Sequence, residues 1–224
     1  DAAGQALDKT GVTFIINPYD EYGLVRAIEF KEKTGQGNVT ALCVGGAEVE
    51  PTLRRALAIG ADDAIRVDAD PQDAFSVASM IAEQAKGGGY DFIFFGKESI
   101  DTNGSSVPGM VAELLDLPLI VSAIHLEAEN GSAKLQREMP GGYEEIETSL
   151  PAVVSCTKGI SEWRIPNMRG IMSARTKPLK VVAGTAVEAA VSTVHFQLPP
   201  AKQGCHYFEA DQAEKLVDVL HEKG

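Results

Sequence analysis

The feature that most constrains the fold is an alternation of short apolar runs with amphipathic segments over the first half of the chain. The apolar runs have the length and composition of buried strands, and they cover residues 12–16, 40–44, 64–67 and 91–95. The segments between and after them predict helices over residues 17–33, 52–59 and 71–84 and a further helix beginning near residue 106. Strands that alternate with helices pair in parallel. The sequence therefore predicts a doubly wound, mostly parallel α/β sheet of the Rossmann-like kind.

The pattern changes after Pro118. Three segments alternate apolar and polar residues with no helical segment between them, over residues 120–126, 133–138 and 143–149. Asn130-Gly131 and Gly141-Gly142 supply turns, so we expect antiparallel hairpins, followed by a buried strand at residues 151–155. Leu198-Pro199-Pro200 forms a semi-rigid step before a short helix at residues 211–221. We expect an α/β domain over residues 1–190 and a C-terminal arm over residues 191–224 that lies on a neighbouring subunit.

Charge and composition exclude several classes of partner. The formal charge is −12 and no basic cluster is interleaved with aromatic residues, which argues against nucleic acid as a partner. The apolar runs are too short to span a membrane, and the first residues do not resemble a signal peptide. Cys43, Cys156 and Cys205 are far apart, so they predict neither disulfides nor a metal site. We expect reduced thiols in a cytoplasmic or mitochondrial-matrix protein.

A polar loop joins the strand at residues 91–95 to the next helix. It contains Asp, Thr, Asn, Gly and two Ser residues and ends at the start of an amphipathic helix. Small donors beside a helix N-terminus favour a phosphate or pyrophosphate. The alternative is that Ser105 or Ser106 only caps the helix. The loop is not a Walker A motif, and no GxGxxG follows a strand.

Catalytic motifs are missing from the sequence. The four histidines have no HExxH spacing, no GxSxG elbow is present, and Cys156 has no identifiable base near it in sequence. We therefore assign no catalytic and no metal-binding residues, and any chemistry is expected to belong to a cofactor.

Apolar residues interrupt a polar segment between Cys156 and Arg175. Ile160, Trp163, Ile165 and Met168 stand among Gly, Pro, Asn and charged residues. Apolar side chains on a loop gain nothing in a monomer, so we expect this loop to contact a partner.

Several motifs resemble one family in the order in which they occur. They are NPYDEYGLVRAIEFKE, GKESIDTNGSSVPGMVAELLDLP, REMPGGYEEIETSLPAVVSC, ISEWRIPNMRGIMSARTKPL and PPAKQGCHYFE. Over essentially the whole chain, the sequence resembles the β subunit of electron transfer flavoprotein. The resemblance implies a fold of the adenine nucleotide α-hydrolase type. It also implies a heterodimer in which the FAD is bound mainly by the α subunit.

The resemblance also implies a nucleotide in this chain. In the common branch of the family the nucleotide is AMP, and in the bifurcating branch it is a second FAD that oxidises NADH. The matching positions are Asn17, Pro18, Tyr19, Asp20, Val44, Gly45, Asp101, Asn103, Gly104, Ser105, Ser106, Val107 and Gly109. Tyr19 stands where the family has an aromatic residue near the flavin of the partner subunit. The family opens with a further strand and loop, roughly 20 to 30 residues by the size of such a unit, before the segment that starts at Asp1.

The resemblance places a partner-recognition loop at residues 158–170. Its apolar anchor falls on Ile160, with Trp163, Arg164 and Ile165 beside it. The partners implied are acyl-CoA or related dehydrogenases of fatty acid β-oxidation, with a quinone oxidoreductase as a further partner. Ile in place of Leu, and Trp163-Arg164-Ile165-Pro166 in place of a Pro-Arg-Tyr-like step, leave the identity of the dehydrogenase open.

Three functions follow from these residues. The first is an electron carrier subunit, not an enzyme, that holds a structural AMP. The second is half of a bifurcating enzyme with a second FAD in the same site. The third, a stand-alone nucleotide-binding module, leaves the loop around Trp163 and the Pro199-Pro200 arm without a purpose.

Overall fold

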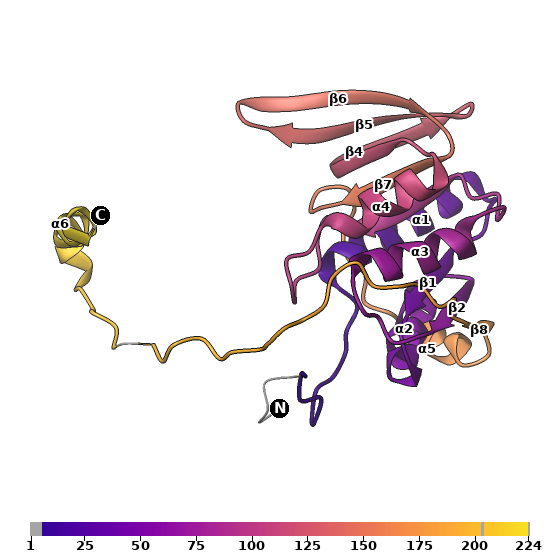
Figure 1. Cartoon of the computed structure of the whole chain (residues 1–224). Coiled ribbons are helices and arrows are strands. Elements are labelled where there is room, and N and C mark those ends of the chain that lie inside the picture. The colour runs from indigo at the N-terminus through magenta and orange to yellow at the C-terminus, as the bar shows by residue number, and fades with distance from the viewer. Residues whose placement is uncertain (1–5, 203, 224) are drawn as a thin grey trace. The chain divides into compact units, whose positions relative to one another are not determined.

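The computed structural model describes residues 6–202 and 204–223 of the chain. They form two units, of which the larger comprises Thr10–Ser192. Its helices are α1 (Pro18–Thr34), α2 (Glu50–Ile59), α3 (Ala74–Ala85), α4 (Ser106–Leu115) and α5 (Met168–Ala174). Its strands are β1 (Thr40–Val44), β2 (Asp63–Asp68), β3 (Phe92–Gly96), β4 (Leu119–Glu129), β5 (Ser132–Met139), β6 (Gly142–Ser149), β7 (Ala152–Cys156) and β8 (Leu179–Ala183). Figure 1 shows their arrangement.

The strands pair in two sets, in the orders β1-β2-β8 and β3-β7-β4-β5-β6. Parallel pairing joins β1 to β2, β2 to β8, β3 to β7 and β4 to β7. Antiparallel pairing joins β4 to β5 and β5 to β6. Among the described residues, β1 and β3 each have one edge that no strand pairs with. The prediction of a mostly parallel α/β sheet with an antiparallel hairpin region is confirmed.

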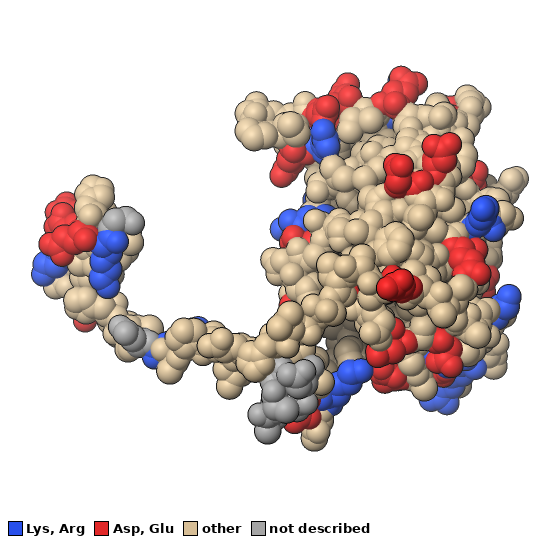
Figure 2. All heavy atoms as spheres, in the orientation of Figure 1, with Lys and Arg blue, Asp and Glu red and all other residues tan. Residues whose placement is uncertain are grey.

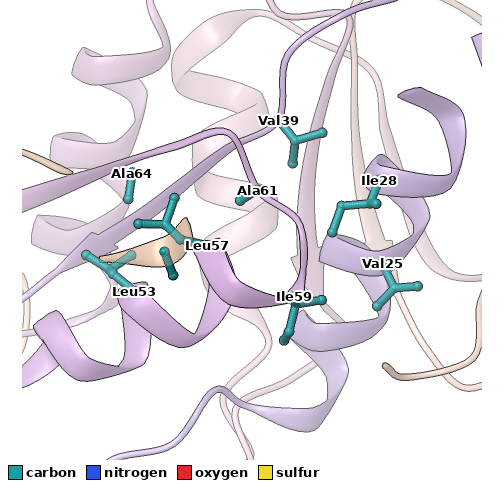
Figure 3. Close-up of a cluster of buried hydrophobic side chains, with 9 residues drawn as sticks. Val25, Ile28, Val39, Leu53, Leu57, Ile59, Ala61 and Ala64 are labelled. Atoms are coloured by element: carbon teal, nitrogen blue, oxygen red, sulfur yellow. The ribbon is translucent and has the colours of Figure 1, made fainter. Parts of the chain in front are cut away.

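Helices cover both faces of the parallel strands. α3 and α4 pack against each other on one face, while α1, α2 and α5 lie on the other (Figure 1). The first of two buried clusters includes Val25 and Ile28 of α1 and Leu53, Leu57 and Ile59 of α2 (Figure 3). Burying such side chains contributes about 1.5–3 kcal/mol each.

Helix α1 also packs against a second buried cluster. That cluster is built from β4, β5 and β7, with Leu126, Leu135 and Val154 among its buried members. Tyr22 and Phe30 of α1 pack against it, and the Phe30 ring stacks on Phe92 with 5.7 Å between ring centroids. Opposite sides of one helix therefore serve two cores.

Three details of the predicted secondary structure were wrong. Residues 12–16 form no strand. An apolar run becomes a strand only where a neighbouring strand edge pairs with it, and no described strand pairs with these residues. α3 starts at Ala74 and not at Pro71, since Asp73 caps it. The loop predicted from Cys156 to Arg175 contains α5, and β8 follows it.

Asp73 ties the start of α3 to a distant segment. Its carboxylate accepts hydrogen bonds from the backbone N–H of Ser76 at 2.8 Å, of Ala190 at 2.7 Å and of Val191 at 3.1 Å. The bond from Ser76 and the others lower the pKa of Asp73 below its ordinary value, against the opposing effect of desolvation. The ionised form is therefore the one that folding favours.

Replacing Asp73 with Ala should lower the free energy of unfolding at neutral pH, because a helix cap is lost. A depressed pKa adds stability above the ordinary carboxyl value, and this stability disappears as the pH falls through the folded pKa. The difference from wild type should therefore shrink below about pH 4, measured by urea unfolding. Asp70→Ala is the control, because among the described residues the Asp70 carboxylate accepts a hydrogen bond only from the nearby Gln72; an equal loss there would contradict the assignment.

The smaller unit contains α6 (Ala213–Lys223), which follows an extended segment and a short 3-10 turn. None of its described side chains is buried, and Leu216, Val217 and Leu220 are exposed on it. Within the described residues, no helix is long and apolar enough to cross a membrane.

On the face of Thr10–Ser192 shown in Figure 2, acidic side chains are scattered with basic ones between them. The Lys and Arg side chains form no continuous basic surface on the described atoms of that face.

Candidate functional sites

The start of α1 is joined by side chains to the loop that follows β3. Asn17 donates through Nδ2 to the carbonyl of Glu98 at 2.8 Å, and its Oδ1 accepts from the N–H of Ile100 at 3.3 Å. Asp20 accepts from the N–H of Gly96 at 2.5 Å. Asn17 stands at the N-cap position of α1, but its side chain makes no capping hydrogen bond. It holds the loop in place instead.

Asp20 is exposed as a residue, but its carboxyl group is surrounded by protein atoms. Desolvation raises its pKa, and the hydrogen bonds from Asn17 and Gly96 oppose that rise. Burial, together with the charge of Asp20, raises the pKa of Cys43 to about 11 and that of Cys156 further. The end of β7 lies near Asp20, because Gly96, whose N–H donates to Asp20, pairs with Cys156. Both thiols stay protonated at neutral pH and are poor nucleophiles.

The polar loop after β3 folds back on itself. The N–H of Ser99 donates to the carbonyl of Gly104 at 2.9 Å, and that of Asn103 donates to the carbonyl of Ser99 at 2.7 Å. Asn103 adopts φ 52°, in the left-handed region that Asn tolerates best after glycine. The side chain of Asp101 accepts from the Ser99 hydroxyl. This closed turn delivers the chain to the first residue of α4.

The N-terminus of α4 has no side-chain cap. Ser105 stands at the cap position without a capping hydrogen bond. Within the described part of the chain, neither the Ser105 nor the Ser106 hydroxyl has a hydrogen-bond partner, and both residues are exposed. The first N–H groups of a helix also lack intrahelical acceptors. Two hydroxyls and a helix N-terminus are thus free to bind an anion, which favours the ligand interpretation over the cap.

Tyr19 and Lys97 form a second feature beside α1. The Lys97 ammonium lies 4.8 Å from the centre of the Tyr19 ring, and it also faces Glu98 at 3.4 Å. Gly96 permits this arrangement, because a Cβ there would lie 2.7 Å from Cβ of Tyr19 and 2.8 Å from the backbone N of Asp20. Lys97 and Gly96 were not among the predicted site residues. The Gly-Lys step directly after a strand was the available signal.

The other predicted nucleotide positions lie on three elements. Pro18 is the first residue of α1, while Val107 and Gly109 are half-buried in α4. Val44 ends β1, and Gly45 follows it, donating to the carbonyl of Val67 in β2 at 3.0 Å. The structure brings the start of α1 and the β3 loop into direct contact. The described contacts of Gly45 are with β2, so its role at a ligand stays a prediction.

Residues 160–172, here called the contact segment, carry several exposed apolar side chains. Trp163 is 57% exposed, Ile165 77% and Met168 72%. The predicted exposure of Ile160 is wrong, because this side chain is 4% exposed and belongs to the cluster of β4, β5 and β7. Trp163 and Ile165, and not Ile160, are therefore exposed apolar side chains of this segment.

Helix α5 fixes the far end of the contact segment. Asn167 caps it by accepting from the N–H of Gly170 at 2.8 Å. Arg54 of α2 donates to the carbonyls of Ala174 and Lys177, both at 2.8 Å. Lys177 in turn donates to the carbonyl of Leu57 at 3.0 Å and to one at Ala61. α2 and α5 thus satisfy the free carbonyls at each other's C-terminal ends.

Comparison with known proteins gives a consistent result. The model of the electron transfer flavoprotein domain matches residues 6–187. The chain is 37% identical to "Electron transfer flavoprotein subunit beta" of Bacillus subtilis over 224 residues, covering 94% of this chain and 87% of that one. It is 40% identical to the protein of the same name from Syntrophomonas wolfei over 193 residues, covering 86% and 77%.

The similarity extends to mammals. The human protein of that name is 31% identical over 233 residues, which cover 100% of this chain and 90% of the human one. With a family match over most of the chain and these identities over nearly all of it, the chain belongs to the electron transfer flavoprotein family, among its β subunits.

Proposed function

We propose that this chain is the β half of a heterodimeric electron carrier. Its partner is an α subunit that holds FAD, and the carrier takes electrons from acyl-CoA or related dehydrogenases. Membership of the β subunits supports the heterodimer and electron transfer. The FAD of the α subunit supplies the redox chemistry. This chain positions the α subunit and recognises the dehydrogenase, and it is not itself an enzyme.

A structural AMP occupies this chain in the proposal. The observation that carries it is the uncapped start of α4, which follows the closed turn at residues 99–104. There the Ser105 and Ser106 hydroxyls have no hydrogen-bond partner among the residues that the structure describes. Asn17 and Asp20 hold that turn by its backbone, while their own side chains are already bonded to protein groups. The phosphate of AMP would meet the hydroxyls and the helix N-terminus.

Two surfaces serve the partners in this proposal. The dehydrogenase meets the contact segment through Trp163 and Ile165, because their exposure has no use in a monomer. The arm at residues 191–224 lies on the α subunit, where Leu216, Val217 and Leu220 of α6 find an apolar groove. A quinone oxidoreductase is the further acceptor of electrons. The carrier works in a bacterial cytoplasm or a mitochondrial matrix.

The nucleotide content of the heterodimer tests this function. The chain is coexpressed with its α partner, the purified complex is denatured, and the released nucleotides are separated by chromatography and counted. We expect one FAD and one AMP per heterodimer. Two FAD and no AMP would replace the carrier with a bifurcating enzyme that oxidises NADH. Failure to form a complex with the α subunit would contradict the proposal as a whole.

A further inference from the structure

Arg164 lies between two exposed apolar residues of the contact segment, Trp163 and Ile165. Trp163 and Ile165, on either side of it, are 57% and 77% exposed, whereas the Arg164 side chain is only 34% exposed. The three residues therefore alternate, with the charged one turned toward the protein and the apolar ones turned outward. This is the reverse of the usual preference for exposed charge and buried apolar surface.

The reason is a two-pronged ion pair with α1. Arg164 donates from Nη1 to Oε1 of Glu32 at 2.8 Å and from Nη2 to Oε2 at 2.9 Å. Nη2 also lies 3.9 Å from Oε1 of Glu29. The hydrogen bonds from Arg164 lower the pKa of Glu32, so the carboxylate is ionised at neutral pH. A bidentate pair fixes the plane of the guanidinium as well as its position.

The pair continues into a network on α1. Glu29 accepts from Nη1 of Arg26 at 3.0 Å. The Arg26 guanidinium lies 4.6 Å from the centre of the Phe30 ring and donates to the carbonyl of Leu126 in β4. Arg164 is thereby connected to α1 and, through Arg26, to β4.

Two further bonds bracket Arg164. Ser161 donates to the carbonyl of Tyr22 in α1 at 2.8 Å, and Asn167 caps α5. Between these two points, Arg164 is the residue whose side chain ties the described contact segment to α1. The pair lies at the surface, where ion pairs contribute little to global stability. Its effect is local, on the five residues between Ser161 and Asn167.

We infer that Arg164 is a positioning residue, which holds Trp163 and Ile165 in the orientation that a dehydrogenase binds. This inference rests on the proposed function of the contact segment. Ordering a side chain on binding costs conformational entropy, so a segment that is ordered beforehand binds more tightly. Lys at this position keeps the charge and loses the two-pronged geometry.

Trp163 itself reports on the inference, because it is the only tryptophan of the chain. Time-resolved fluorescence anisotropy of the full 224-residue chain measures its local nanosecond motion. Arg164→Gln and Glu32→Gln should each increase the amplitude of that motion, by about twofold for the first. The double variant should move no more than Arg164→Gln, because both changes break one pair. Arg164→Lys should fall between wild type and Arg164→Gln.

Arg169→Gln is the matched control. It removes a positive charge from the same segment, and no hydrogen bond or ion pair of Arg169 is found within the described residues. We expect its anisotropy to equal that of wild type. If Arg164→Gln also leaves the anisotropy unchanged, the ion pair does not order the segment and the inference is overturned.

Binding separates this inference from the function on which it rests. The heterodimer is titrated against an immobilised acyl-CoA dehydrogenase from the same source. Trp163→Ala should weaken binding about tenfold and Arg164→Gln about threefold. If Trp163→Ala weakens binding and Arg164→Gln does not, positioning by Arg164 is wrong while the contact surface stands. If Trp163→Ala has no effect, the contact surface itself is wrong, and the role of Arg164 in recognition falls with it.

Discussion

Replacing Gly96 with Ala should abolish retention of the nucleotide by the purified heterodimer. The added Cβ would lie 2.7 Å from Cβ of Tyr19, 2.8 Å from Nδ2 of Asn17 and 2.8 Å from the backbone N of Asp20. Two of these atoms are fixed by the first turn of α1, so relief requires α1 to move away from the end of β3. That movement breaks the bonds of Asn17 and Asp20 to the loop and displaces the start of α4.

The measurement is the nucleotide content of the denatured complex, together with its urea unfolding curve. We expect a loss of about 1–3 kcal/mol in stability, as for other overpacked sites. Gly142→Ala is the control, since a Cβ at this position in β6 meets nothing within 4 Å. Normal nucleotide content in the Gly96→Ala complex would show that the contact between α1 and the β3 loop does not shape the site.

Ile160→Ala and Ile165→Ala should have opposite consequences. Ile160 is 4% exposed and packs in the cluster of β4, β5 and β7, so its truncation leaves a cavity and should cost about 2–5 kcal/mol of stability. Ile165 is 77% exposed, and its truncation should change stability by less than about 0.5 kcal/mol.

Electron transfer then distinguishes the two residues. At limiting carrier concentration, Ile165→Ala should slow electron transfer from the dehydrogenase while the heterodimer and its flavin content remain normal. Ile160→Ala, at a temperature where it is still folded, should transfer electrons at a rate closer to wild type. A stable Ile160→Ala variant with slow transfer would restore Ile160 as the anchor and refute its structural role.

The hairpins and most of the parallel strands were predictable because their signals are local, whereas β8 was missed and residues 12–16 form no strand. A period of two along residues 120–149, with Asn130-Gly131 at a turn, identifies β4 and β5 without knowledge of the rest of the chain. α5 was missed for the opposite reason. Its seven residues include a glycine, and that glycine is required because a Cβ at Gly170 would lie 2.3 Å from the carbonyl oxygen of Ala58. Contact with α2 stabilises a helix that its own composition does not predict.

The candidate site was predictable as a loop but not as an assembly. Small polar residues before an amphipathic helix pointed to residues 101–109. The bond from Asn17 to Glu98 joins positions 81 residues apart, and no local pattern reports it. The family resemblance placed Asn17 and Asp20 among the nucleotide positions, yet it could not show that their side chains bind the backbone at the β3 loop. Ile160 was misplaced because an apolar residue in a polar segment looks the same whether it faces solvent or the core.

The position of α1 between two hydrophobic clusters has a consequence for how the domain comes apart. Val25 and Ile28 belong to one cluster, and Tyr22 and Phe30 pack on the other. In the described chain, β1 of one strand set does not pair with β3 of the other. Loss of either cluster therefore removes part of the burial that keeps α1 helical, and with it a wall of the remaining cluster. Residues 10–192 should consequently melt as a single cooperative unit, with the amide protons of α1 among the slowest to exchange with solvent.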